Sequence, residues 1–299
     1  MRRIRWLRVG LLALGALIAC AGVACSLLGP DFSPAVATDS MRAEGLESRH
    51  VAWTPEGGDE ETLHYVVAGS GGRRVLFVHG SPGTWEAYRG YLDDPRLRAV
   101  ARLLAFDRPG FGDSGRGRTE PSLARQAAAA ARVLDAEPGP PAVVVGHSLG
   151  GPIAARLAVD RPDLVGALVL VAPSLDPSLE RHRWYNVAGS WRAVQLFLSV
   201  DMITSNRELW PLRAELEALE PRLREVRCPT IVIQGDEDEL VPPANADFAA
   251  RALPPGSVEV RRVPGEGHFV LWTRPEWTVA AIIESLSRPA DALSGTGGE

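Results

Sequence analysis

One serine in the chain has neighbours typical of an enzyme nucleophile. Ser148 is the centre of a Gly-His-Ser-Leu-Gly segment at 146–150, which follows the apolar run 142–145 and precedes a helical pattern. A sharp turn from strand to helix would hold Ser148 in a strained conformation with its hydroxyl exposed, and the flanking glycines would avoid collisions across that turn. The helix N-terminus would direct N–H groups at negative charge forming beside the serine. The alternative interpretation is a glycine-rich turn in which serine caps a helix.

A serine hydroxyl is a poor nucleophile without a base, and His268 is the candidate. It lies in a loop after the last expected strand and just before the closing helix. Asp238 follows the expected strand 230–233, so the order Ser148, Asp238, His268 is the one that a strand-turn-helix serine predicts. We expect Asp238 to orient His268. Asp236 is expected to help fix the loop that carries Asp238. Asp176, after the expected strand 167–171, is the less favoured alternative for the acid.

Two backbone N–H groups could stabilise an oxyanion beside Ser148. Gly80 follows the apolar run 75–78 and would let the chain turn close to the serine, so that Ser81 presents its N–H. With the N–H of Leu149, this gives the two donors that acyl transfer needs. The loop 107–114 is interpreted as structural, bracing the floor of the site. The remaining histidines of the body are expected in non-catalytic places: His50 and His64 among exposed side chains of early strands, His79 in a turn, His147 directed away by the serine turn, and His182 in solvent.

Strand and helix patterns alternate along the body. Short continuous apolar runs, typical of strands buried on both faces, alternate with helical stretches, and this order predicts a mostly parallel, doubly wound α/β fold. Two early strands are expected to pair as a hairpin. The expected strands are 49–54, 62–68, 75–78, 102–106, 142–145, 167–171, 230–233 and 258–263, and the expected helices are 122–134, 149–159, 245–252 and 274–286.

Composition excludes several kinds of chemistry. The net charge of -5 leaves no basic excess for binding nucleic acid through its phosphates. All 32 basic residues are Arg, so Schiff-base chemistry and a phosphate-loop lysine are excluded. Of the three cysteines only Cys228 lies in the body, and the six histidines are scattered, which predicts neither a metal site nor a disulfide framework. We expect no cofactor, and the sequence indicates no oligomeric state.

The N-terminal segment 1–28 is predicted to be an export signal. Four arginines precede residue 9, and residues 9–28 carry no formal charge, which is typical of a secretory signal or membrane anchor. Leu-Ile-Ala-Cys at 17–20 resembles a lipobox, in which Cys20 would be lipidated; Cys25 is a poorer candidate. The alternatives are an uncleaved anchor and cleaved soluble export. Each places the body outside the cytoplasm, in the cell envelope, after a linker at 29–45; the tail 291–299 is expected to be disordered.

Five segments together resemble the α/β-hydrolase superfamily. They are His-Gly-x-Pro-Gly at 79–83, Asp-Arg-Pro-Gly-x-Gly-x-Ser at 107–114, the serine segment at 146–150, Gly-x-x-Asp-x-x-Val-Pro at 235–242 and Gly-x-Gly-His at 265–268. The resemblance implies a core formed by 46–173 and 225–290, and it supports Asp238 over Asp236 as the acid. A serine at 148 departs from the aspartate nucleophiles of haloalkane dehalogenases and epoxide hydrolases. Leu149 and Ser81 depart from proline iminopeptidases.

The resemblance also implies that the insertion 174–224 is a helical cap over the site. Residues 193–200 are apolar, and leucines recur at helical spacing between 207 and 226. Trp184, Tyr185, Trp191 and Phe197 could line a pocket for an apolar acyl or alkyl group, or pack the cap on the core.

The expected function is a serine hydrolase that cleaves an ester-like or activated carbonyl compound through a covalent acyl-enzyme. The same residues could support carbon–carbon bond hydrolysis or cofactor-free perhydrolysis. A hypothesis from another class is an envelope binding protein that keeps the scaffold without catalysis.

Overall fold

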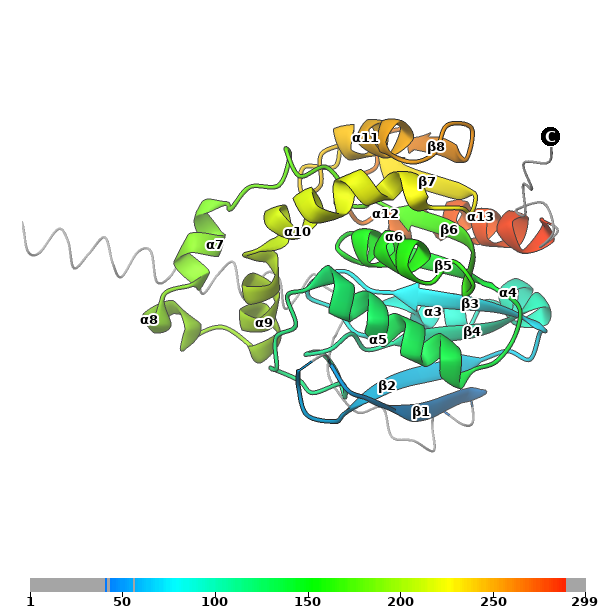
Figure 1. The fold of residues 1–299 in the computed structure, drawn as a ribbon, viewed down its shortest axis with the longest axis horizontal. Coiled ribbons are helices and arrows are strands. Elements are labelled where there is room, and N and C mark those ends of the chain that lie inside the picture. The colour runs from blue at the N-terminus through cyan, green and yellow to red at the C-terminus, as the bar shows by residue number, and fades with distance from the viewer. Residues whose placement is uncertain (1–40, 42–43, 56, 289–299) are drawn as a thin grey trace, which may run out of the picture.

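An eight-stranded sheet organises the molecule (Figure 1). The computed structural model describes residues 41, 44–55 and 57–288. Strand order is β1-β2-β4-β3-β5-β6-β7-β8, with β2 antiparallel to β1 and β4 and all later pairs parallel. The expected mostly parallel α/β architecture and the β1–β2 hairpin are therefore confirmed. The strands are β1 (Leu46–Trp53), β2 (Glu61–Ala68), β3 (Arg73–Val78), β4 (Ala101–Phe106), β5 (Ala142–His147), β6 (Val165–Val171), β7 (Thr230–Gly235) and β8 (Val258–Val263).

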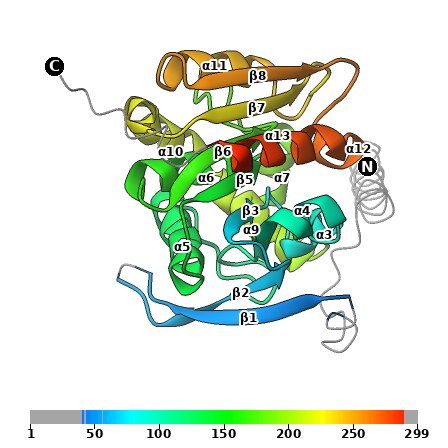
Figure 2. The ribbon, with the colours of Figure 1, turned by 90° about the vertical axis from the view of Figure 1, so that its right-hand side faces the viewer.

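Helices cover both faces of the sheet, as Figures 1 and 2 show. One face packs against α5 (Leu123–Ala136), α6 (Gly150–Asp160), α10 (Leu212–Leu219), the 3-10 helix η2 (Glu220–Glu225) and α11 (Ala244–Ala252). The other packs against the 3-10 helix η1 (Trp85–Tyr88), α3 (Arg89–Leu92), α4 (Pro95–Val100), α12 (Val270–Thr273) and α13 (Pro275–Ser287).

The apolar strand residues explain this layering. In β3, Leu76 and Val78 pack into one core layer, while Val75 and Phe77 pack into the other, and all four are fully buried. Successive side chains of a strand point to opposite faces, so a strand covered on both sides must be apolar throughout. The carboxyl ends of β3 to β7 thus meet at one edge of a buried scaffold.

The segment between β3 and β4 holds three short helical turns that the sequence patterns did not predict. They are η1, α3 and α4, of four to six residues each, too short for an apolar repeat to develop. A capping signal was nevertheless present before α4. Asp94 accepts from the N–H of Arg96 at 2.8 Å, and Pro95 occupies the first helical turn.

The insertion between β6 and β7 holds a chain of short helices. They are α7 (Trp184–Gly189), α8 (Arg192–Gln195), α9 (Val200–Leu209) and α10. The apolar stretch 193–200 is divided, because Ser199 caps α9 by accepting from the N–H of Met202 at 3.2 Å. Four of the leucines expected on one helical face are about 1% exposed: Leu212, Leu216, Leu219 and Leu223. Helices α7 and α8 extend away from the sheet at the left of Figure 1.

The segments predicted to be an export signal, a linker and a disordered tail lie outside the described residues. These are 1–28 with Cys20, nearly all of 29–45, and the tail 291–299. Within the part of the chain that the structure describes, no helix combines the length and apolar character needed to cross a membrane.

Candidate active site

Ser148 occupies a sharp turn between β5 and α6. Its φ of 54° lies in the left-handed region, which non-glycine residues adopt only where the surroundings enforce it. Its N–H donates to the carbonyl of Val171 at 3.0 Å, and its carbonyl accepts from the N–H of Gly151 at 2.9 Å. The turn that the sequence predicts is present, and β6 on one side and α6 on the other hold it in place.

The glycines on either side of the serine are required by close backbone contacts. A Cβ on Gly146 would lie 2.3 Å from the carbonyl oxygen of Gly150. A Cβ on Gly150 would lie 2.1 Å from the carbonyl oxygen of Val78 at the end of β3. Real Cβ atoms do not approach oxygen so closely, so both positions need glycine for α6 to begin at this point.

The structure pairs His268 with Asp238. The Nδ1 atom of His268 lies 2.8 Å from Oδ2 of Asp238, and the Asp238 side chain is fully buried. The other carboxylate oxygen accepts from the N–H groups of Leu240 and Val241 at 2.9 and 2.8 Å, while Gln234 contacts Oδ2 at 3.2 Å. Because Oδ2 of Asp238 accepts from Nδ1 of His268, the proton of the neutral ring is on Nδ1, which leaves Nε2 as the basic nitrogen.

The other two acids considered from the sequence are elsewhere. Asp236 is exposed and faces Arg262, with 3.9 Å between Oδ1 and Nη1. Gln234 and the backbone N–H groups of Leu240 and Val241 hold Asp238 within the loop. Arg262, the partner of Asp236, also donates to the carbonyl of Pro243 at 2.9 Å, and the helper role of Asp236 stays a prediction. Asp176 accepts from the N–H and hydroxyl of Ser178 at 2.8 and 2.6 Å, which is a local turn.

His147 connects the serine turn to the His268 loop. Its Nε2 lies 3.1 Å from the carbonyl oxygen of His268, and the two rings are 4.9 Å apart between centroids. Burial, and then the neighbouring His268, lower the pKa of His147 to about 3. The ring is therefore neutral and donates from Nε2 to the carbonyl. His147 thus holds the backbone of the loop that carries His268.

The loop after β3 lies directly against Ser148. A Cβ on Gly80 would be 3.0 Å from the Cβ of Ser148, so this loop and the serine are in contact. Among the described residues, no backbone carbonyl accepts from the N–H of Ser81 or of Leu149. Both expected oxyanion donors therefore have no backbone acceptor, and Leu149 stands at the N-terminus of α6.

His79 is a fully buried structural residue next to that loop. Its Nε2 accepts from the N–H of Arg108 at 3.0 Å, so Nδ1 carries the proton and donates to the Gly80 carbonyl at 2.7 Å. Burial is the main cause that holds the pKa of His79 well below its usual value. The neutral ring joins the Gly80 loop to the loop that begins at Asp107.

A buried ion pair between cap and core was not anticipated from the sequence. Glu208 on α9 pairs with Arg108, at 2.8 Å for Oε2–Nη1 and 2.9 Å for Oε1–Nη2, and both side chains are at most 1% exposed. Arg108 also donates to the Gly80 carbonyl at 2.9 Å, and the Ser81 hydroxyl donates to Glu208. Gln126 on α5 donates to Glu208 at 3.1 Å.

This cluster joins the cap to the proposed oxyanion loop. Breaking a buried pair leaves an uncompensated charge, which costs about 3–5 kcal/mol. A second cap–core pair, Arg116–Asp201 at 2.7 Å, is partly exposed and is worth about 0–1 kcal/mol. No spacing rule could reveal the Arg108–Glu208 pair, because its members are 100 residues apart.

A second Ser–His–Asp chain of hydrogen bonds lies on the outer strands. Ser48 Oγ is 2.9 Å from His64 Nε2, and His64 Nδ1 is 2.8 Å from Asp107 Oδ2. His64 is only 4% exposed, so the expectation of an exposed side chain there was wrong. Asp107 also accepts from the N–H groups of Trp85 and Asp113 at 2.8 and 3.0 Å. Ser48 lies within regular β1, without the positive φ or helix N-terminus of Ser148.

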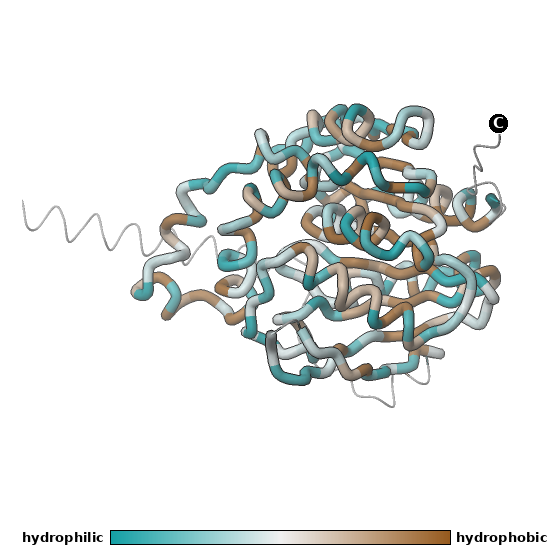
Figure 3. The backbone as a smooth tube through the Cα atoms, viewed as in Figure 1, coloured by the Kyte–Doolittle hydropathy of each residue, from teal (hydrophilic) through white to brown (hydrophobic). Residues whose placement is uncertain are grey.

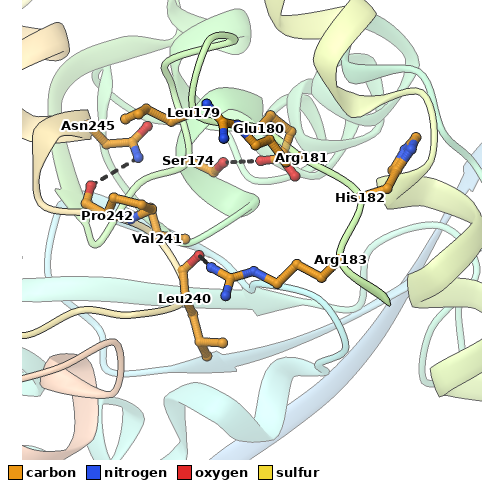
Figure 4. A pocket seen from close by; sticks show the side chains of 10 residues that line it. All are labelled: Ser174, Leu179, Glu180, Arg181, His182, Arg183, Leu240, Val241, Pro242 and Asn245. Atoms are coloured by element: carbon orange, nitrogen blue, oxygen red, sulfur yellow. Dashed lines mark hydrogen bonds between the residues drawn. The ribbon is translucent and has the colours of Figure 1, made fainter. Parts of the chain in front are cut away.

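A cavity of about 500 Å³ adjoins the site (Figure 4). Its lining includes Ser174 and Val241, whose N–H groups bond the Ser148 carbonyl and the Asp238 carboxylate respectively. Glu180 accepts from the Ser174 hydroxyl at 2.9 Å, and burial raises the pKa of Glu180. Arg183 donates to the carbonyl of Leu240 at 3.2 Å and so closes one side.

The cap aromatics do not line this cavity. Trp184, Tyr185, Trp191 and Phe197 are 71%, 45%, 57% and 85% exposed. Packing on the core is therefore wrong for these four side chains, whereas a role in binding an acyl or alkyl group stays a prediction. Among the described residues, no group of three His, Cys, Asp or Glu side chains could hold a metal ion.

Comparison with known proteins identifies the family. Residues 75–281 match the model of the alpha/beta hydrolase family. The chain belongs to this family. It is 28% identical over 257 residues to a pimeloyl-[acyl-carrier protein] methyl ester esterase of Edwardsiella ictaluri, covering 74% of this chain and 96% of that protein.

Two further proteins are similar to this chain. An acetyltransferase component of the acetoin cleaving system of Cupriavidus necator is 39% identical over 111 residues, and the match spans 37% of this chain and 29% of that relative. The fold of this hydrolase is also similar to that of a bacterial membrane phospholipase A, at a TM-score of 0.62 and 21% identity, over 97% and 100% of the two chains.

The buried cap–core pair generates a stability prediction. We expect Glu208→Leu to lower the free energy of unfolding by about 3–5 kcal/mol, because Arg108 is left buried without its partner. The double variant Arg108→Met/Glu208→Leu should lose less than Glu208→Leu alone. Denaturant unfolding of each variant measures this, with Asp201→Ala, at the exposed cap–core pair, as the control expected to cost about 0–1 kcal/mol. A double variant less stable than the single one contradicts the account.

Proposed function

We propose that this alpha/beta hydrolase is a serine esterase acting on ester-like carbonyl compounds. The observation that carries the proposal is the His268–Asp238 pair, at 2.8 Å, on a loop that His147 ties to the strained turn of Ser148. Similarity to a methyl ester esterase over most of both chains supports the same class of substrate.

The proposed reaction starts with attack of the Ser148 hydroxyl oxygen on the carbonyl carbon. His268 Nε2 takes the hydroxyl proton, and Asp238 stabilises the imidazolium through Nδ1. Collapse of the tetrahedral intermediate breaks the bond to the leaving alcohol, which receives that proton from His268. Water then attacks the acyl-serine by the same route and releases the acid.

The N–H groups of Ser81 and Leu149 are proposed to hold the oxyanion. Both lie beside the serine turn and have no backbone acceptor among the described residues. Removing one donor of this kind typically lowers the rate by about 10²–10³. In this proposal the Arg108–Glu208 pair positions the Ser81 donor, because both of its members bond the Gly80–Ser81 segment.

Labelling of the nucleophile tests the proposal. A fluorophosphonate probe should label the wild-type chain and fail to label Ser148→Ala, whose ester hydrolysis should fall by about 10⁴-fold or more. Ser48→Ala is the matched control, because Ser48 also contacts a histidine that contacts an aspartate, and it should keep the label. Labelling that persists in Ser148→Ala but disappears in Ser48→Ala would assign the chemistry to the outer strands. Labelling that persists in both Ser148→Ala and Ser48→Ala would contradict the esterase proposal.

We also propose that the body is exported and tethered to the cell envelope. The support is the sequence of residues 1–28, with four arginines before an uncharged run and a lipobox-like segment ending at Cys20. Radioactive palmitate should label the wild-type chain and Cys25→Ala but not Cys20→Ala. Absence of label from a wild-type chain that stays in the membrane fraction favours an uncleaved anchor instead, and recovery of the body from the cytosol would overturn the tether.

A further inference from the structure

The outer part of the cap exposes large apolar side chains. Of the twelve large hydrophobic residues exposed in the described part of the chain, seven fall within residues 181–200, here called the cap tip. Leu196 and Phe197 are 83% and 85% exposed, which is unusual for side chains of this size. Figure 3 shows apolar segments of α7 and α8 at the end of the molecule farthest from the sheet. The other five are Trp184, Tyr185, Val187, Trp191 and Val200.

The charge of the cap tip differs from that of the rest of the chain. It contains three arginines and no Asp or Glu, whereas the whole chain has a net charge of -5. Tryptophan, tyrosine and arginine around an apolar centre are the residues that favour the boundary between lipid headgroups and acyl chains. Arginine side chains near an anionic lipid surface are attracted to its headgroups.

This charge favours lipid over a second copy of the chain. Two cap tips facing each other would bring together six arginines with no acid from either tip, and like charges across an interface are unfavourable. An anionic lipid surface instead offers negative headgroups to the arginines and acyl chains to Leu196 and Phe197.

The cap tip is connected to the site. Arg183, beside Trp184, donates to the carbonyls of Glu239 and Leu240 at 2.6 and 3.2 Å, in the loop that also carries Asp238. The cavity of about 500 Å³ is lined by Arg183 and Leu240 at this junction. Leu240 and Phe269, each within two residues of the His268–Asp238 pair, are 47% and 56% exposed. Exposed apolar side chains thus lie both on the cap tip and beside the His268–Asp238 pair.

We propose that the cap tip docks on an anionic lipid surface, with its apolar side chains inserted among the acyl chains, and delivers lipid-embedded esters to the site. The proposal rests on the proposed esterase function for its substrate, but the docking itself is independent of catalysis.

Fluorescence quenching tests the docking directly. The full-length chain is placed in vesicles of phosphatidylcholine and phosphatidylglycerol whose acyl chains carry bromine. We expect quenching of wild-type tryptophan emission to be reduced in Trp184→Phe/Trp191→Phe and unchanged in Trp53→Phe, because Trp53 is buried. Trp6, in the segment 1–28, is present in all three chains and contributes equally to each. Equal quenching in the wild type and Trp184→Phe/Trp191→Phe would overturn the proposal. A second result would also overturn it: no quenching in vesicles, together with a dimer in detergent that the cap-tip substitutions abolish. That result would assign the surface to a second copy of the chain.

Hydrolysis assays then separate docking from chemistry. For Leu196→Asp/Phe197→Asp we expect kcat/KM on an ester embedded in the vesicles to fall at least about tenfold, which corresponds to about 1.4 kcal/mol. The rate on a short soluble ester should stay unchanged. Val100→Asp, also exposed but at the opposite edge of the sheet, should change neither rate. Equal loss on both esters, or loss on neither, overturns the role in delivery. Absence of hydrolysis of every ester by the wild type would contradict the esterase proposal and leave the quenching result to decide docking.

Discussion

The close approach of α6 to the ends of β3 and β5 is the constraint on which the site depends. At Gly150 the helix begins in contact with the carbonyl of Val78, and the chain can reach this point only by passing through the left-handed conformation at Ser148. The same packing places the Gly80 loop against the serine. The proposed nucleophile and both proposed oxyanion donors therefore belong to one packed unit, whose strain is held by the buried sheet.

Two polar networks extend this unit outward. Asp238, after β7, holds Nδ1 of His268, and the ring of His147, at the end of β5, holds the backbone carbonyl of His268. Arg108 and Glu208 hold the Gly80–Ser81 segment from the cap side. The cap is thus anchored near the site by a buried pair, while its outer helices keep their apolar side chains exposed.

Local signals predicted most of the fold and much of the site. Apolar runs such as 75–78 and 142–145 mark strands because those strands are covered on both faces, and the glycines around Ser148 mark a turn that admits no β-carbon. The features that the sequence did not predict depend on contacts between distant segments. The burial of His64 by Asp107 and the pairing of Glu208 with Arg108 have no local signature. Exposure of Phe197 was likewise hidden, since an apolar run is equally compatible with a core.

The most direct measurement of the central claim compares two neighbouring aspartates. The account predicts that Asp238→Asn lowers kcat/KM for a short soluble ester by about 10⁴, because the amide no longer fixes the Nδ1 proton of His268. Asp236→Asn, two residues away and exposed, should leave kcat/KM within about twofold of the wild type, a change of about 0.4 kcal/mol. Equal activity of the two variants, or a larger loss in Asp236→Asn, would contradict it.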